Sequence, residues 1–296
     1  MKTKGIFFIL LSGIGYGFLG IFGKFLLQDG VALGPALAIR FSIASILMWI
    51  YLLAFKKSEL KKISQKEILL CMGLGILGYA TFSSLYFLAL EGLSASMTVL
   101  LLYTYPTMVV VLSILILKEK LAIAQKWALP ISFLGIVLLI GGNYSITSGK
   151  SLLYGFLCAF VYALYILFSS EKLKKIEPTV SVAIIQSSAA LILLLLHIHT
   201  QETLFFTLRH GFVYILGLSL VVTILPMITF AQGIKYLTAS EVSLLYTVEP
   251  LAAILLATLL FGEKMEVTQL FGGAFVLISL YLCSFRKVVL KSSVQK

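Results

Sequence analysis

Charged residues are scarce in this chain. Asp, Glu, Lys and Arg together make up 12% of its 296 residues, whereas hydrophobic residues make up 60%, and the mean hydropathy is +1.07. A soluble domain cannot hide so large an apolar fraction inside itself. The composition therefore excludes a soluble protein and predicts an integral membrane protein, in contact with the lipid bilayer.

Cysteine is nearly absent as well. Cys71, Cys158 and Cys283 all fall within apolar runs and show no paired spacing, which argues against a disulfide framework and against a zinc site. The sequence also lacks a phosphate-binding loop, an HExxH pattern and a hydrolase serine motif. We therefore expect no metal, no cofactor and no enzymatic activity.

Long apolar runs dominate the chain instead. A helix needs roughly 20 apolar residues to cross a hydrocarbon core about 30 Å thick. Ten runs meet this requirement: 5–27, 34–55, 67–90, 93–117, 124–142, 151–170, 179–199, 211–232, 238–261 and 267–285. We therefore predict an all-α integral membrane protein with ten transmembrane helices, the first of them retained rather than cleaved as a signal peptide.

Acidic residues are outnumbered by basic ones, 12 to 23, which gives a net charge of +11. The basic residues are concentrated in every second segment between the apolar runs. If the N-terminus is cytoplasmic, 18 of them lie on the cytoplasmic side and 3 on the other, with Lys24 and Arg40 set aside as intramembrane. The positive-inside rule then predicts a multi-pass protein of the cytoplasmic membrane with both termini in the cytoplasm. No nucleic-acid partner is needed to explain the charge.

The chain also contains an internal repeat. Residues 93–125 align with residues 237–269 at an offset of 144, with 11 of 33 positions identical, including Pro106 with Pro250. Five helices per half is an odd number, so the second half crosses the membrane in the opposite sense, an arrangement that supports alternating access. A duplicated bundle that transports nothing is the alternative. The predicted inverted-topology repeats of five helices are residues 1–142 and 143–296.

Several of these features occur together in one known family. The ten-span plan, the prolines of the fourth and ninth spans, the phrase EPLAAILLATLLFGEKM at 249–265 and Arg40 in AIRFSIASILMWI resemble the EamA family of the drug/metabolite transporter superfamily. The resemblance covers essentially the whole chain. The first half departs from it, since Tyr105 stands where the second half has Glu249.

The resemblance implies a secondary active transporter that exports small organic metabolites, such as amino acids or related amines, with coupling to protons and alternating access. Two other functions stay open. One is an uptake or exchange carrier for a nucleotide-like or sulfonium metabolite, and the other is a non-transporting scaffold or lipid-interacting subunit. A homodimer stays open as well.

Ionisable groups inside a membrane are costly, so each is a candidate for function. Glu249 lies about eleven residues from either end of its run, and its stem is too short to reach the interface. Its carboxyl group must be protonated, paired or in contact with water. We interpret it as a proton-coupling or substrate-amine residue, with a structural hydrogen bond as the alternative. Tyr246, one turn earlier, is expected to hold the carboxylate or line the path.

Two basic residues are further substrate or coupling candidates. Arg40 lies about six residues into the second run, and its partner is a carbonyl, a lipid phosphate, a substrate carboxylate or Glu249. Lys24 is either a functional cation or a side chain that reaches to the interface. Whether Glu249 pairs with Lys24 or Arg40 is left open. Lys24 continues a stripe of Gly13, Gly17 and Gly20, which predicts either close helix packing or a bare wall beside a ligand.

Prolines and tyrosines complete the candidate set. Pro106 and Pro250 lack an N–H, so they should kink their helices, free the carbonyls of Leu102 and Tyr246, and act as hinges. Inside the spans, the sequence also places three tyrosines that either line a substrate path or pack in the core. These are Tyr86, Tyr105 and Tyr162.

Overall fold

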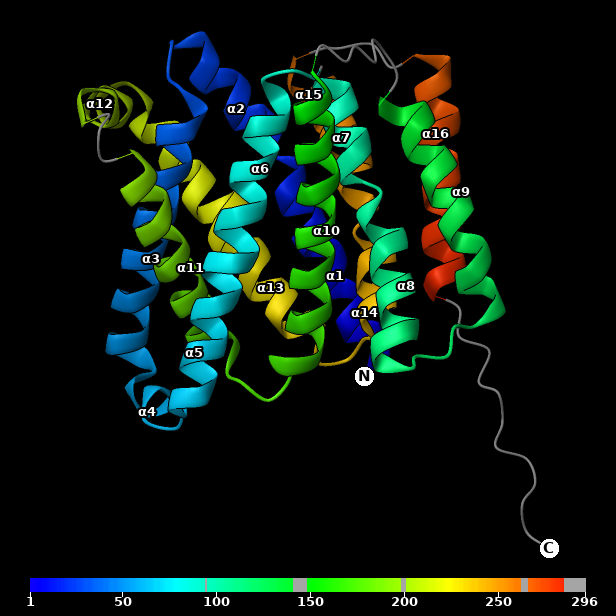
Figure 1. The fold of residues 1–296 in the computed structure, drawn as a ribbon, viewed down its shortest axis with the longest axis horizontal. Coiled ribbons are helices and arrows are strands. Elements are labelled where there is room, and N and C mark those ends of the chain that lie inside the picture. The colour runs from blue at the N-terminus through cyan, green and yellow to red at the C-terminus, as the bar shows by residue number, and fades with distance from the viewer. Residues whose placement is uncertain (94, 141–147, 198–200, 262–265, 285–296) are drawn as a thin grey trace, which may run out of the picture.

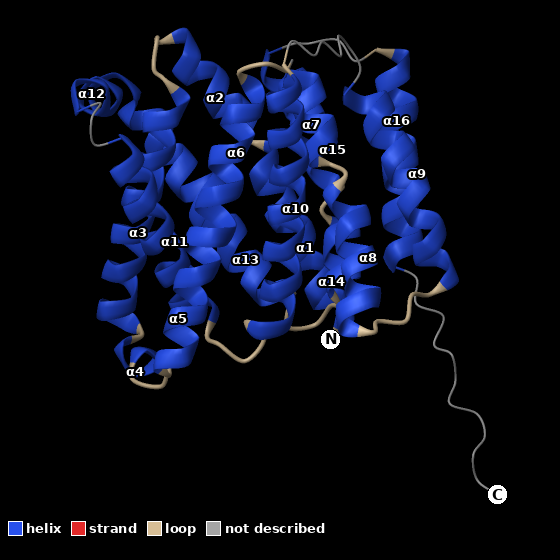
Figure 2. Ribbon diagram, in the orientation of Figure 1, coloured by secondary structure: helices blue, strands red, loops and turns tan. Residues whose placement is uncertain are grey.

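The computed structural model describes residues 1–93, 95–140, 148–197, 201–261 and 266–284, and within these residues every regular element is a helix (Figures 1 and 2). The Gly-Glu-Lys part of the second repeat, in residues 262–265, lies outside the described residues. The helices are α1 (Lys2–Gly17), α2 (Leu19–Gln28), α3 (Leu33–Phe55), α4 (Lys57–Leu60), α5 (Gln65–Gly73), η1 (Leu74–Ala80), α6 (Thr81–Leu90), α7 (Ala95–Leu102), α8 (Tyr105–Leu117), α9 (Ile123–Ile140), α10 (Gly149–Lys172), α11 (Pro178–His197), α12 (Gln201–Gly217), η3 (Leu218–Ile224), α13 (Leu225–Gly233), α14 (Ala239–Leu245), α15 (Val248–Phe261) and α16 (Val267–Ser284).

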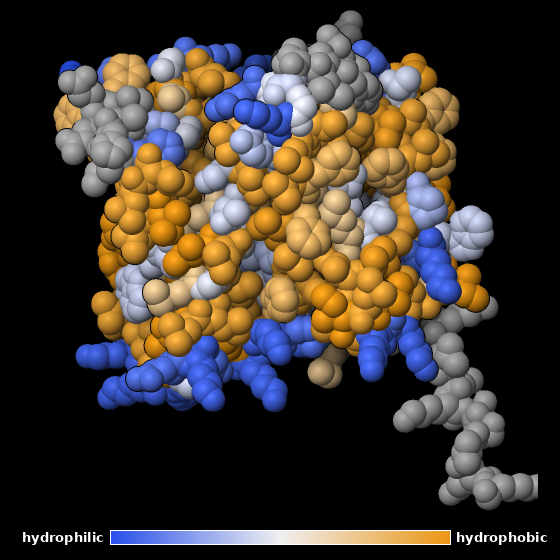
Figure 3. Space-filling view, in the orientation of Figure 1, coloured by the Kyte–Doolittle hydropathy of each residue, from blue (hydrophilic) through white to orange (hydrophobic). Residues whose placement is uncertain are grey.

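The predicted spans are confirmed. In the described chain, nine helical segments are long and apolar enough to cross a membrane, and α16 is a shorter apolar helix at the tenth position. Figure 3 shows an apolar band across the visible face of the bundle and a row of hydrophilic side chains along the end that holds the N-terminus and α4 in Figure 1. We call this the basic end. The first span differs from its prediction because it is divided at Phe18 into α1 and α2.

The two halves pack against each other reciprocally. The first span of the first half, through α1, contacts α13 and α15 of the second half, and the first span of the second half, α10, contacts α6 and α8 of the first. The second spans α3 and α11 pair, and so do the fifth spans α9 and α16. Such an exchange of partners is what a pseudo-two-fold axis between inverted repeats produces.

A π-helical segment marks the repeat in the backbone itself. The segments η1 and η3 each contain seven residues and begin at Leu74 and Leu218, which are 144 positions apart (218 minus 74). The offset equals that of the sequence repeat, although the sequences LGILGYA and LSLVVTI share only their first residue. The duplication therefore persists in helix geometry where side-chain similarity has been lost.

The helices of the fourth and ninth spans are each interrupted by a two-residue turn. The break between α7 and α8 falls at Tyr103 and Thr104, and the break between α14 and α15 falls at Tyr246 and Thr247. In each break the threonine hydroxyl donates to the carbonyl three residues earlier, at 2.7 Å in both cases. In Figure 1, α8 and α14 lie toward the basic end, and α7 and α15 lie toward the opposite end.

The prolines begin the second segment of each broken span. Pro106 is the second residue of α8 and Pro250 the third residue of α15, where a missing N–H costs no helical hydrogen bond. The prediction that Pro250 frees the carbonyl of Tyr246 is wrong. That carbonyl accepts a hydrogen bond from the Glu249 N–H at 2.9 Å, because the chain tightens as it leaves the break.

Two glycines of the α1–α2 stripe are packing positions. A Cβ atom on Gly13 would lie 2.6 Å from Cγ1 of Val248, and one on Gly17 would lie 2.9 Å from Cβ of Ala252. Both contacts are to α15, so these glycines allow the two helices to approach closely. Gly20 has no atom within 4 Å of such a Cβ, and the stripe therefore ends before it.

Gly17→Ala tests this packing. We expect the free energy of unfolding to fall by about 1–3 kcal/mol, because the new methyl group would also lie 3.1 Å from the backbone nitrogen of Ala253, which cannot move aside. Thermal unfolding of the purified protein in detergent measures the effect. Gly20→Ala is the matched control and should be neutral or slightly stabilising. Equal melting temperatures for both variants would contradict the close contact.

An ion pair joins α3 to α11 at the basic end. The Lys56 Nζ donates to Oε1 of Glu177 at 2.7 Å. This hydrogen bond raises the pKa of Lys56. Partial burial alone would raise the pKa of Glu177, but hydrogen bonds from Lys56, from the Thr179 hydroxyl and from the Val180 N–H outweigh it, so the pKa is lowered.

The pair predicts an acid-dependent loss of stability. Because the folded-state pKa of Glu177 lies below the ordinary value of about 4.3, its contribution is complete above that pH and disappears as the pH falls through the folded-state pKa. Glu177→Gln should lower the free energy of unfolding by up to about 1 kcal/mol at neutral pH, with the difference from wild type shrinking in acid. Glu171→Gln, which breaks the exposed pair with Lys174, is the control. A difference that does not depend on pH would count against the ion pair.

Candidate functional site

Glu249 lies where the two broken spans meet. It is the second residue of α15, directly after the second break, and its carboxylate lies within interaction range of the hydroxyl of Tyr103 in the first break. Its side chain is half-buried. The contact therefore joins the two inverted halves at their broken spans.

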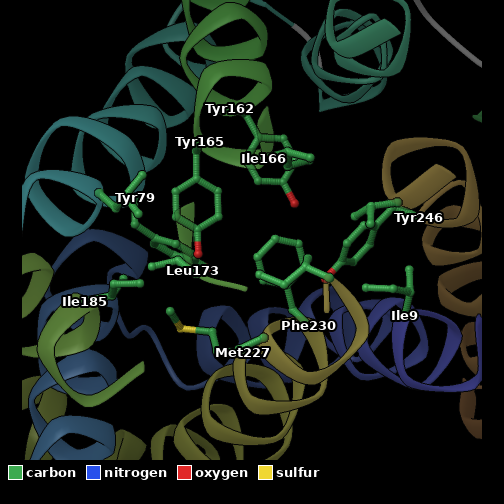
Figure 4. Packing of buried hydrophobic residues seen from close by; sticks show 14 of the residues in the cluster. Ile9, Tyr79, Tyr162, Tyr165, Ile166, Leu173, Ile185, Met227, Phe230 and Tyr246 are labelled. Carbon is green, nitrogen blue, oxygen red and sulfur yellow. The ribbon is translucent and has the colours of Figure 1, made fainter. Parts of the chain in front are cut away.

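Aromatic rings surround this contact and come from both halves. The ring centroid of Tyr162 lies 4.7 Å from that of Tyr105 and 4.7 Å from that of Phe82. The ring centroid of Phe230 lies 6.0 Å from that of Tyr165 and 5.9 Å from that of Tyr246. In Figure 4, Tyr162 and Tyr165 extend from α10 toward Phe230 of α13. We call this set the aromatic cluster: Tyr16, Tyr79, Phe82, Tyr103, Tyr105, Tyr162, Tyr165, Phe230 and Tyr246.

Three of the predicted tyrosines lie near the carboxylate. Tyr86, Tyr105 and Tyr162 are all within electrostatic range of Glu249. Tyr105 is 1% exposed, and among the described residues its hydroxyl has no hydrogen-bond partner. A buried hydroxyl without a partner is uncommon. This hydroxyl lies within electrostatic range of the Glu249 carboxylate.

The Tyr246 hydroxyl is bonded to Ser12, whereas its second predicted role, lining the substrate path, stays a prediction. Its hydroxyl lies 2.6 Å from Oγ of Ser12, and the Ser12 hydroxyl donates to the carbonyl of Pro226 at 2.7 Å. Because the only hydrogen of Ser12 is used in that second bond, the Tyr246 hydroxyl donates to Ser12 rather than holding Glu249. The chain Tyr246–Ser12–Pro226 ties α14 to α1 and α13 beneath the aromatic cluster.

The two basic candidates do not pair with Glu249. Arg40 is 5% exposed, and among the described residues its guanidinium makes no ion pair. Its Cζ lies 5.0 Å from the centroid of Phe41. Lys24 is exposed on α2. The structure therefore gathers Glu249 with Tyr86, Tyr105 and Tyr162, and it leaves the two cations elsewhere.

Tyr103 is the residue that the sequence reasoning did not select. The signal was present, because the letters LLYT precede the proline in both halves, at 101–104 and 244–247. Each Tyr-Thr pair is a helix break in the structure. A helix end inside a membrane must satisfy its backbone groups locally, and the repeated threonine performs that task.

The two ends of the bundle differ in how the broken spans pack. At the basic end α8 packs against α14, the Ser240 hydroxyl donates to Oε2 of Glu119 at 3.2 Å, and Lys2 pairs with Glu241 at 2.9 Å. In the described chain, α7 and α15 show no comparable packing at the opposite end. The half-helices are thus joined on one side of Glu249 and apart on the other.

A carboxyl group without a basic partner, bordered by aromatic faces, can bind a proton or an organic ammonium group. The ammonium would gain an ion pair together with cation–π contacts from the tyrosine rings. A metal site is not supported, since no group of three or more His, Cys, Asp or Glu in the described parts of the chain could hold one.

The chain is similar to known proteins in both sequence and structure. The model of the EamA-like transporter family matches residues 3–141 and again residues 149–285. An uncharacterized transporter of Archaeoglobus fulgidus is 30% identical over 208 residues, which are 70% of this chain and 73% of that protein. An uncharacterized transporter of Clostridium kluyveri is 26% identical over 292 residues, 93% of this chain and 91% of that protein.

A third relative and a solved structure extend the likeness to the full length. The uncharacterized inner membrane transporter YicL of Salmonella typhimurium is 24% identical over 290 residues, 95% of each chain. A crystal structure matches this fold with a TM-score of 0.80 at 16% identity, covering 95% of this chain and 96% of the other. That structure supports the fold alone.

A double-mutant cycle tests the Tyr246–Ser12 hydrogen bond. Ser12→Ala leaves the Tyr246 hydroxyl buried without a partner and should lower the free energy of unfolding by about 1–3 kcal/mol. Tyr246→Phe should cost less, because Ser12 keeps its bond to Pro226. The double variant should be more stable than the sum of the single effects predicts, by roughly 0.5 kcal/mol or more. Additive changes in thermal unfolding would contradict the bond.

Proposed function

Because this chain belongs to the EamA-like transporter family, we propose that it is a secondary transporter that exports small organic metabolites, amino acids or related amines, in exchange for protons. Transport proceeds by alternating access between the two inverted halves. The membrane is the cytoplasmic membrane, and the lysine-rich basic end faces the cytoplasm, in accord with the positive-inside rule.

Glu249 carries the proposal. Its carboxylate lies within interaction range of the Tyr103 hydroxyl of the other half, and no basic side chain in the described chain pairs with it. An isolated charge at this depth is unfavourable. A proton or a substrate ammonium neutralises it, and because both use the same carboxylate they exclude each other. Competition of this kind couples export of an amine to entry of a proton.

The breaks supply the movement. The helices α8 and α15 can change their angle to α7 and α14 at the breaks, because Pro106 and Pro250 have no N–H to donate to the preceding segment. Opening the basic end requires α8 to leave α14, which breaks the hydrogen bond from Ser240 to Glu119. Closing the opposite end brings α7 toward α15.

Glu249→Gln tests the coupling. The variant keeps the shape and a hydrogen-bond acceptor for Tyr103 but cannot exchange a charge. We expect pH-driven flux of labelled amino acids and amines in proteoliposomes to fall roughly tenfold or more, as loss of a charged hydrogen bond of about 1.5–3 kcal/mol implies. Glu91→Gln, at an exposed position, is the control.

Two results would overturn the proposal in different ways. Undiminished proton-dependent flux in Glu249→Gln would remove Glu249 from the coupling. Absence of flux for every amino acid and amine with the wild-type protein would remove the substrate class.

A further inference from the structure

A cavity lies at the basic end of the bundle, and none of its lining residues belongs to the aromatic cluster. Its volume is about 280 Å³, and its walls come from the start of α5, the connection between α10 and α11, the first turn of α11 and the turn after α13. Figure 1 shows the start of α5 at this end, and Figure 3 shows the row of hydrophilic side chains there. Three glutamates, three lysines and three aliphatic residues line the cavity.

The three glutamates are already engaged within the protein. Glu59 accepts a hydrogen bond from the Lys62 Nζ at 2.6 Å. Glu67 accepts from both the backbone N–H and the hydroxyl of Ser64, each at 2.8 Å, and Glu177 belongs to the ion pair that joins α3 to α11. In the described parts of the chain these carboxylates do not converge as a metal site would require. The cavity is therefore not built for a cation.

Two of the three lysines have no counter-charge. Lys175 lies in the connection between α10 and α11, and Lys235 lies in the turn between α13 and α14. Among the described residues, neither forms an ion pair with an acidic side chain. Ammonium groups around one concave space produce a positive potential that the cavity walls focus. The unused charge of the cavity therefore suits an anion.

The shape and position of the cavity narrow the choice of anion. Its volume leaves room for a group much larger than a water molecule. Ile176 and Val180 are buried and add an apolar wall beside the lysines. Leu69, two residues after the lining residue Glu67, is 67% exposed on the apolar surface, so the cavity lies at the boundary where phospholipid headgroups are found. A phosphate ester combines oxygens for the lysines with carbon for the apolar wall.

We propose that this cavity binds a phosphate group, held by Lys175 and Lys235, with Lys62 lining the same space. The phosphate belongs either to the headgroup of an anionic phospholipid or to a free phosphate ester, since both present the same chemistry. The lining residues come from both halves of the chain, so a bound phosphate joins the halves and stabilises this arrangement of the basic end. The site is separate from Glu249 and does not depend on the proposed transport function.

Thermal unfolding of the purified full-length protein in dodecyl maltoside, at constant ionic strength, tests the site. The probes are glycerol phosphate for the free ester, dioctanoyl phosphatidylglycerol for the anionic lipid and dioctanoyl phosphatidylcholine for a lipid without net charge. Binding to the folded state raises the melting temperature as the ligand concentration rises, so each titration gives an apparent Kd. We expect at least one of the two anionic probes to bind roughly tenfold or more tightly than the phosphatidylcholine, because only these probes carry an uncompensated negative charge.

Paired lysine variants separate a defined site from diffuse surface charge. Lys175→Gln combined with Lys235→Gln should weaken binding of the anionic probe roughly tenfold or more, and each single variant roughly threefold or more. The single variants carry the test if the double variant does not fold. Lys57→Gln combined with Lys172→Gln is the matched control, since it removes the same charge from exposed positions of α4 and α10 that do not line the cavity. This control should weaken binding by about twofold at most, because solvent and salt screen those charges.

The outcomes identify the source of the phosphate or overturn the site. Lysine-dependent binding of glycerol phosphate supports a free ester, and lysine-dependent binding of phosphatidylglycerol alone supports a lipid headgroup. The proposal is overturned if neither anionic probe binds more tightly than phosphatidylcholine, if the variants of Lys175 and Lys235 bind as tightly as wild type, or if the control pair loses as much affinity as they do. Each of these results leaves the role proposed for Glu249 unchanged.

Discussion

The meeting of two interrupted helices, one from each half, is the constraint on which the arrangement of this molecule depends. Glu249, directly after one interruption, lies within interaction range of Tyr103 in the other. In hydrocarbon, irregular backbone is tolerated only where the protein itself satisfies its polar groups. The threonine bonds within each break, the Ser12–Tyr246 bond and the aromatic cluster supply that environment. Close packing of Gly13 and Gly17 against α15 then fixes where the second break lies.

Most of the fold could be predicted from the sequence because the thickness of the bilayer sets the length of each helix. Ten spans in two inverted halves follow from three patterns in the sequence. These are runs of about 20 apolar residues, lysines concentrated in every second segment between the runs, and a proline repeated at one offset. Local helix geometry was less accessible. The π segments η1 and η3 share one residue in seven, so no motif indicates them, and the break at Phe18 has no proline to mark it.

The site was predicted in part, for reasons that follow from physical chemistry. Glu249 could be selected because a charge at the midplane is costly whatever surrounds it. The direction in which a side chain points cannot be predicted in the same way, because it depends on where the helix ends. A continuous helix would have placed Tyr246 one turn from Glu249, but the break turns its hydroxyl to Ser12, which is 234 positions away in the chain. Tyr103 reaches Glu249 for the same reason, and helical spacing gave no hint of it.

The spacing between break and proline also bears on the symmetry of the two halves. Pro106 follows the Tyr-Thr pair after one residue, Tyr105, whereas Pro250 follows its pair after two, so that Val248 is additional and Glu249 stands at the place of Tyr105. One residue turns a helix by about 100°, so the faces of α8 and α15 beyond the breaks are rotated relative to each other. A duplicated bundle with identical halves would present equivalent groups to the two sides of the membrane. A single added residue removes that equivalence, so the two halves present different chemical groups where the broken spans meet.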